Sequence, residues 1–232
     1  MTDQPAFKLS DQDARDLVVG FVQTNLLELE KDVATTGAHP YPKVGERVRV
    51  KLANIGGVTY TPDNPDAAAW TTTYPMEMRT VVLAVRLALF LKASRWGVST
   101  IYWGGMGIGG STATDRHSLG RAIDFHGAET NSGKLDVSTD WGSQLITLPN
   151  GKKAHAWPVG TPPYYRLDVD TPAGGFFYDV YHFLTGEARD KLGGIAGSSI
   201  GDHSFILCPD MPDPAKRPFH QDHIHCDVAG DD

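Results

Sequence analysis

The sequence predicts an α+β fold, with helices packed behind a small antiparallel sheet. Residues 76–96 carry apolar side chains at helical spacing, which predicts the longest helix. Residues 98–103 and 122–125 form two short, mainly apolar segments, as expected of strands. Two further short strands flank an Asn-Gly pair within residues 145–157, a pattern typical of a β-hairpin. Helices and hairpins in one chain favour the α+β class.

Residues 1–74 are predicted to form an N-terminal extension that packs against the rest of the protein. Ser10 offers a hydroxyl cap, and the acidic residues after it suit the positive end of a helix. Apolar residues at loosely helical spacing continue this helix towards Leu29. Residues 47–52 alternate basic and apolar side chains, which predicts a half-exposed strand.

Glycines mark two boundaries in the middle of the chain. Gly97 follows the longest predicted helix and is typical of a helix stop. Residues 104–110 are rich in glycine, but no Gly-Lys-Ser/Thr follows, so we exclude a phosphate-binding loop. This segment is expected to form a loop that borders the functional site.

A further helix is predicted over residues 176–189.

Length and charge limit the classes of function. A chain of 232 residues can bury one substantial core, so we expect a single domain. The net charge of −7 argues against a nucleic-acid-binding surface, which needs a basic face. The most apolar stretch, residues 81–91, contains Arg86 and is far shorter than the roughly 20 residues of a membrane span, so no membrane insertion is expected. Cys208 and Cys226 are equally compatible with a disulfide and with two buried thiols.

Two distant segments concentrate the residues that bind metals. Residues 115–124 contain His117 and Asp124, with a glycine between them, and residues 220–225 contain three histidines. Catalytic zinc sites usually take three protein ligands and leave one position to water. His117, Asp124 and one histidine of the second segment make such a set.

The expected backbone brings these side chains onto one face. On a strand over residues 122–125, Asp124 faces away from its two apolar neighbours. Gly120 supplies the bend that lets His117 fold back beside Asp124. His223 and His225 share a strand face because they are two residues apart. The other histidines are assigned ordinary surface or core roles: His39, His126, His155, His182 and His203.

The pattern His-x-x-Gly-x-Ala-x-Asp, followed much later by His-x-His, resembles that of the LAS-type zinc peptidases. This family includes D-Ala-D-Ala carboxypeptidases, murein endopeptidases and extensin-like bacterial domains. The matching residues are His117, Gly120, Ala122, Asp124, His223 and His225. The resemblance covers about half of the chain, from roughly Val81 to Val228. It implies a LAS/hedgehog-type peptidase fold with a long insertion.

The resemblance also implies roles for individual residues. His117, Asp124 and His225 would bind one Zn²⁺ per chain, and His223 would act as the general base on the attacking water. His220 resembles a further active-site histidine of the murein endopeptidases. Asp222 lies where other branches have a carboxylate base, but it should point the opposite way on a regular strand, so it ranks second.

The sequence departs from the family pattern at two places. Family members commonly have serine where this chain has Asp115, and they tend to carry an arginine near the position of Trp103-Gly104-Gly105. Arg116 or Arg121 would then stabilise the oxyanion in place of that arginine, and we choose Arg116.

These assignments divide the domain into three segments. Residues 75–126 and 203–232 would form the zinc-site core, and residues 127–202 an insertion that selects the substrate. The expected substrate is a peptidoglycan stem peptide or crosslink, so the protein should act outside the cytoplasm, in the periplasm or cell wall. The first five residues lack the basic start and apolar run of a signal peptide. The delivery route is therefore left open between lysis, a secretion device and a trimmed leader.

Two other interpretations remain open. In the first, a fourth protein ligand closes the zinc site, and the protein is a recognition module without catalysis. In the second, the protein is a metallopeptidase of a peptide that does not come from the cell wall. Fragments released from purified murein would distinguish the last interpretation from the wall peptidase.

Overall fold

A computed structural model describes most of the chain, including both predicted metal-binding segments. The described residues are 4–30, 42–63, 73–105, 116–141, 145–147, 153–155, 167, 171–187, 206–209 and 219–228. The helices are η1 (Ala6–Lys8), α1 (Asp11–Gln23), α2 (Met78–Ala93), α3 (Val137–Asp140) and α4 (Pro172–Glu187). The strands are β1 (Leu27–Leu29), β2 (Val48–Ile55), β3 (Thr59–Pro62), β4 (Thr73–Met76), β5 (Thr100–Trp103), β6 (Ala122–Thr130), β7 (Gly133–Asp136), β8 (Leu145–Thr147), β9 (Lys153–His155), β10 (Ile206–Leu207) and β11 (Ile224–Asp227).

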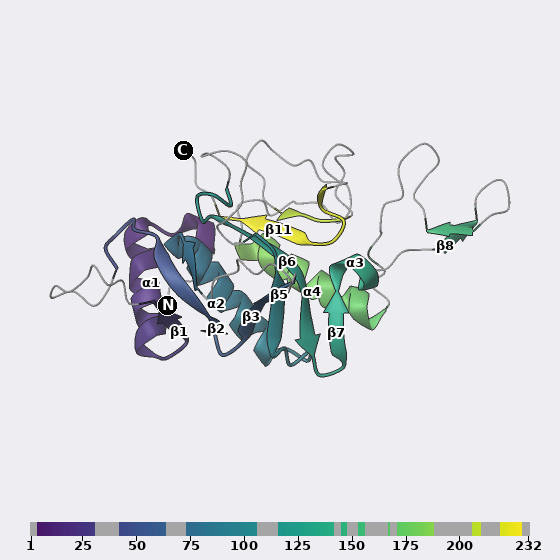
Figure 1. The fold of residues 1–232 in the computed structure, drawn as a ribbon, viewed down its shortest axis with the longest axis horizontal. Helices are drawn as coiled ribbons and strands as arrows, with labels where there is room; N and C mark the ends of the chain where they lie inside the picture. Colours follow the sequence, from purple (N-terminus) through teal and green to yellow (C-terminus); the bar gives the residue numbers. More distant parts are fainter. Residues whose placement is uncertain are drawn as a thin grey trace.

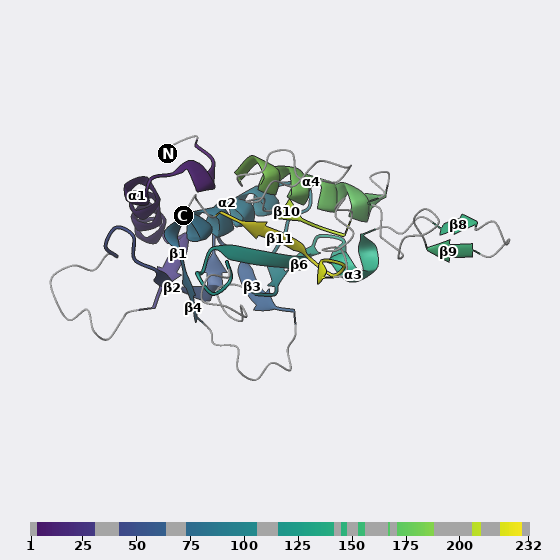
Figure 2. The same cartoon turned by 90° about the horizontal axis from the view of Figure 1, so that it is seen from above.

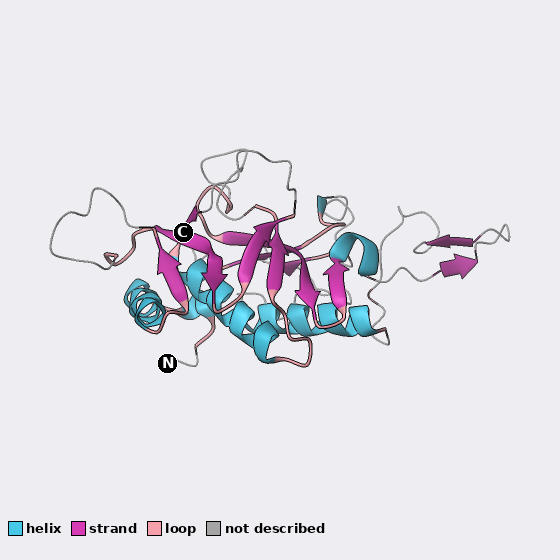
Figure 3. Cartoon of the chain, turned by 60° about the horizontal axis from the view of Figure 1, so that its bottom comes forward, coloured by secondary structure: helices cyan, strands magenta, loops and turns pink. Residues whose placement is uncertain are grey.

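The central feature is a six-stranded sheet in the order β10-β11-β6-β5-β3, with β7 also paired to β6. In Figure 3 the long helices lie along one side of the strands. A second sheet joins β1, β2 and β4, and β8 and β9 form a two-stranded sheet. Helices packed beside mainly antiparallel strands confirm the predicted α+β class. The strands that carry the candidate ligands, β6 and β11, are antiparallel as predicted, whereas the sheet as a whole is mixed, because β3 and β5 pair in parallel.

Strand β6 packs one of its two faces against the hydrophobic core of the protein. Phe125 and its neighbour across the strands, Ile224, are at most 1 % exposed. On α4, the ring of Phe176 packs 6.3 Å from the ring of Phe125, centroid to centroid. Burying one such aromatic side chain stabilises the fold by about 1.5–3 kcal/mol. The apolar positions of β6 therefore fix which residues face the opposite side.

Helix α1 begins as predicted but ends earlier. The Ser10 side chain accepts a hydrogen bond from the backbone N–H of Asp13. At the other end, Asn25 adopts φ 57°, and the N–H groups of Asn25 and Leu26 donate to the carbonyls of Val22 and Phe21. This pair of bonds is the Schellman motif that ends many helices. Leu29 consequently lies in strand β1 and not in the helix.

The other predicted elements are present with shifted ends. Helix α2 lies within residues 76–96, and α4 begins four residues before the predicted Phe176, with Pro172 as its first residue. Thr171 caps α4 by accepting a hydrogen bond from the N–H of Gly174. Strands β2, β5 and β6 and the β8–β9 hairpin overlap the predicted positions, and β6 continues past the predicted end at Phe125 to Thr130. Residues 106–115, which include most of the glycine-rich segment and Asp115, lie outside the described residues.

Strands from all three predicted segments meet in the six-stranded sheet. Strand β3 comes from the predicted extension and β7 from the predicted insertion, yet both pair with core strands. The division into core, extension and insertion stays a prediction. No helix among the described residues is long and apolar enough to cross a membrane.

Candidate metal centre

The two predicted metal-binding segments meet where β6 pairs with β11. Figures 1 and 2 show these strands side by side, although they are about a hundred residues apart in the sequence. In the antiparallel register His225 lies directly opposite Asp124. The Nδ1 atom of His225 is 2.8 Å from Oδ1 of Asp124. Both side chains project from the face of the sheet opposite to Phe125 and Ile224.

A glycine turn carries His117 to the same place. The N–H of Gly120 donates to the carbonyl of His117, and Gly120 adopts φ 70°, a conformation that favours glycine. A Cβ atom at Gly120 would lie 2.9 Å from the carbonyl oxygen of Pro75, so the turn also packs closely on β4. The bend expected at this glycine is confirmed.

The distances within the triad fit a metal ion. Nε2 of His117 is 3.2 Å from Nδ1 of His225 and 3.4 Å from Oδ2 of Asp124. Ligands bonded at 2.0–2.2 Å to a tetrahedral ion lie about 3.3 Å apart. One donor atom from each of the three residues lies within 4.8 Å of the others. His117, Asp124 and His225 could therefore hold a metal ion together, and this geometry does not fix which metal.

The remaining nitrogen of each imidazole faces a second protein group. Nδ1 of His117 makes a hydrogen bond with the carbonyl oxygen of Gly105. Nε2 of His225 lies 3.6 Å from Oδ2 of Asp227, whose side chain is only 1 % exposed. Metal-binding histidines usually have such an outer partner, which fixes the tautomer and the ring orientation. The donor atoms directed at the triad are thus Nε2 of His117 and Nδ1 of His225.

Charge in the metal-free site is shared between Asp124 and the histidines. Burial disfavours ionisation of Asp124, but the hydrogen bond from His225 and the nearby imidazoles outweigh it and hold the pKa of Asp124 below its ordinary value. Burial also opposes a charged His225, yet the hydrogen bond to Asp124 and the nearby carboxylate of Asp227 raise its pKa to about 10. A metal bound at Nδ1 must therefore displace a proton from His225.

Three further predicted residues lie beside the triad. His223 directly precedes β11, and its Nε2 is 3.6 Å from Oδ1 of Asp124. Its Nδ1 is 2.8 Å from Oδ1 of Asp222, and this contact lowers the pKa of the Asp222 carboxyl. The ring of His220 lies 5.0 Å from the ring of His223 and 5.8 Å from that of His225, centroid to centroid. Asp222 therefore approaches the triad through His223.

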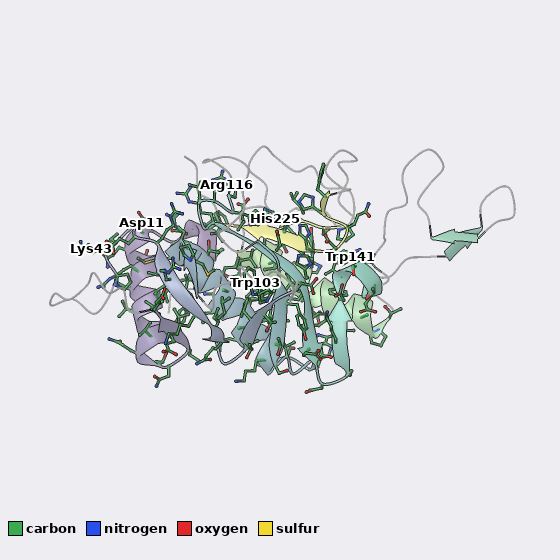
Figure 4. All side chains as sticks on the ribbon, in the orientation of Figure 1. Asp11, Lys43, Trp103, Arg116, Trp141 and His225 are labelled. Atoms are coloured by element: carbon green, nitrogen blue, oxygen red, sulfur yellow. The ribbon has the colours of Figure 1, made fainter. Side chains whose placement is uncertain are left out.

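Arg116 stands at the first position of the turn that carries His117. Its backbone carbonyl accepts a hydrogen bond from the N–H of Arg121. Figure 4 labels Arg116 and, on β11, His225. The role of Arg116 at an oxyanion stays a prediction.

The sequence interpretation missed two residues beside the site, His126 and Asp227, whereas Gly105 belongs to the glycine-rich segment that was expected to border it. Gly105 and Asp227 hold the outer nitrogens of the two histidines, and the His126 ring lies 5.2 Å from the His223 ring. Strand alternation offered a signal for both missed residues, because His126 and Asp227 each follow a predicted ligand by two residues. Of the other histidines, His39 and His203 lie outside the described residues, as does the side chain of His155.

No disulfide joins the two buried cysteines, Cys208 beside β10 and Cys226 on β11. Burial raises the pKa of the Cys226 thiol, which opposes a role as nucleophile or metal ligand.

Comparison with known proteins adds no assignment: no protein-family model, curated protein or solved structure matches the chain. The site is therefore defined by its own geometry as a three-residue candidate metal centre.

Proposed function

We propose that the protein is a zinc-dependent peptidase of the LAS type, which hydrolyses peptide bonds in peptidoglycan stem peptides or crosslinks. The observation that carries the proposal is the triad of His117, Asp124 and His225, with a third histidine, His223, within reach of the same carboxylate. Two histidines and one carboxylate form a common ligand set of catalytic zinc. The match to the motif of the LAS family supports the choice of reaction and the LAS/hedgehog-type fold.

The ligand types favour zinc over harder cations. Imidazole nitrogens suit zinc and other transition metals, whereas magnesium and calcium prefer oxygen donors. Bound there, zinc would supply a Lewis acid for the scissile carbonyl and would acidify the attacking water.

His223 is the proposed general base. Its Nε2 faces the triad, 3.6 Å from Asp124, and its Nδ1 bonds Asp222. The ring can thus accept a proton from water at Nε2 while Asp222 holds the opposite nitrogen. Such a base later returns the proton to the leaving amine. His220, in ring contact with His223 and His225, would contact the substrate, and Arg116 would stabilise the oxyanion.

The number of candidate ligands favours catalysis over a closed structural centre. In the described part of the chain, the potential metal cluster contains three residues and not four. Structural zinc sites usually have four protein ligands, whereas catalytic sites have three and a water. This observation favours the peptidase over a recognition module.

The test combines metal analysis with substrate digestion. The protein is loaded with Zn²⁺ and incubated with purified murein, and the fragments are identified by mass spectrometry. We expect new peptide termini, which also identify the bond that is cut. The triad variants His117→Ala, Asp124→Ala and His225→Ala should lose both zinc and activity.

His223→Ala separates the base from the ligands. It should retain one zinc per chain while activity falls by about 10²–10⁴-fold, the usual contribution of a general base. His182→Ala, on the exposed side of α4, is the matched histidine control and should match the wild type. Undiminished turnover by metal-free protein would contradict the proposal. Digestion of unrelated peptides, with murein left intact, would favour a peptidase of another substrate.

A further inference from the structure

Beyond the triad and its predicted base, strand β6 carries one histidine, His126, on the same face of the sheet. His126 follows Asp124 by two residues, so the two side chains project from the same face. Its ring stacks on that of His223 with centroids 5.2 Å apart and planes inclined by 28°. Nδ1 of His126 lies 3.4 Å from Oδ2 of Asp63, just beyond β3.

Besides His126, His223 contacts Asp222, the ring of His220 at 5.0 Å and, at 3.6 Å, Oδ1 of Asp124. It precedes β11, so the hydrogen bonds of that strand do not hold it as they hold His225. Its hydrogen-bond partner Asp222 has a side chain that is 59 % exposed. A contact of this kind, open to water, restrains a side chain only weakly. By contrast, the stacked rings of His126 and His223 are 14 % and 12 % exposed.

His126 is in turn anchored from several sides. Strand β6 pairs with β11 as far as Phe125 and with β5 on both sides of His126, which itself falls at the register shift between Phe125 and Gly127. Asp63 also contacts the ammonium of Lys134, and that ammonium lies 4.3 Å from the centre of the Tyr102 ring. Gly104 closes the remaining side, because a Cβ atom there would lie 2.5 Å from Nε2 of His126. The ring of His126 therefore has little freedom to move.

We propose that His126 is a positioning residue, whose ring, anchored by Asp63, holds the His223 imidazole in the orientation needed to take a proton beside the metal centre. This inference rests on the proposed function for its catalytic consequence. The positioning itself concerns only the contact between two rings of the chain. It can therefore be tested in a protein without any turnover.

The catalytic consequence should be a fall in kcat with little change in KM. Misplacing a catalytic group by about 1 Å can slow a reaction by about 10²-fold. We expect His126→Leu to lower kcat by about 10- to 100-fold at unchanged zinc content, because Leu lacks a flat face for the imidazole. His126→Phe keeps a ring of similar size at that place and should recover most of the loss. The kcat of Asp63→Asn should lie between those of His126→Leu and His126→Phe, because this variant keeps the His126 ring but weakens the contact that anchors it.

The second measurement does not need activity. Histidine side-chain NMR of the metal-free protein reports the ring of His223, assigned by comparison with His223→Ala. In His126→Leu we expect its resonances to shift and broaden, and in His126→Phe to stay sharp. His182→Leu, on α4, is the matched control and should leave both kcat and the His223 resonances unchanged.

The kinetic and NMR measurements distinguish a failure of the positioning proposal from a failure of the peptidase proposal. If the wild type cuts no peptide but the His223 ring responds as described, the positioning holds and the peptidase assignment fails. If the wild type is active and His126→Leu alters neither kcat nor the His223 resonances, the positioning inference is overturned. A rise in KM alone would also overturn it, because His126 would then contact substrate directly.

Discussion

At the scale of single residues, the outer partners of the two histidines decide how well the triad can bind a metal. Asp227 is buried and faces Nε2 of His225, the nitrogen directed away from the triad. We expect Asp227→Asn to weaken zinc binding by about 10–100-fold, because the imidazole loses the carboxylate that orients it. The dissociation constant can be measured at fixed pH by competition with a chromophoric chelator.

The matched control is Asp179→Asn. Asp179 also bonds an aromatic N–H, that of Trp96, but it lies on α4 and outside the site. This variant should bind zinc as the wild type does. Equal affinities for the Asp227 and Asp179 variants would show that the buried carboxylate does not tune the triad.

At the scale of elements, the turn that holds His117 depends on one glycine. Gly120 combines φ 70° with a close approach to the carbonyl of Pro75. Gly120→Ala should destabilise the protein by about 1–3 kcal/mol, through the backbone conformation and the clash. It should also lower the zinc affinity, since the displaced turn carries His117. Urea unfolding and metal competition measure the two effects.

Gly133→Ala provides the comparison for this turn. Gly133 has φ 111°, but nothing lies within 4 Å of an added Cβ, and it is the first residue of β7, in the hairpin that β7 forms with β6. Its replacement should reduce stability without changing zinc affinity. If both variants bound zinc like the wild type, the turn would not set the position of His117.

Local patterns in the sequence predict the elements of the site better than their mutual arrangement. The alternation around Asp124 correctly predicts its face on β6, and Ser10 correctly marks the start of α1. The antiparallel register that puts Asp124 opposite His225 depends on strands far apart in the chain. Spacing within either segment carries no information about that register. The position of His126 was missed because the predicted strand stopped at Phe125, whereas β6 continues to Thr130.

The sheet topology shows the same limit. Strand β3 joins β5 in parallel, which requires a crossover connection, here one that contains α2. The residues of β3 give no sign of this partner. Likewise, the end of α1 is set by the positive φ of Asn25, while the apolar spacing beyond it continues to suggest a helix.

At the scale of the whole molecule, the stability of the metal-free protein should fall as the pH rises. Contacts with Asp124 and Asp227 raise the pKa of His225 from 6.5 to about 10. A group whose pKa is higher in the folded state stabilises that state fully below its unfolded pKa and loses this contribution as the pH rises. The loss should therefore run from about pH 6.5 to pH 10. The free energy of urea unfolding, measured across this range with a chelator present, checks it.

Two comparisons make this pH dependence specific to His225. His225→Gln should have a flatter profile, because the titrating imidazole is gone. The stability of the zinc-loaded protein should also depend less on pH above pH 6.5, since the metal replaces the proton at Nδ1 of His225. The zinc-loaded protein should be more stable at every pH, because a ligand that binds only the folded state stabilises it. Stability that rises between pH 6.5 and pH 10 in the metal-free wild type would contradict the protonated pair of His225 and Asp124. In that case contacts other than the attraction between a charged His225 and Asp124 would have to hold the triad together.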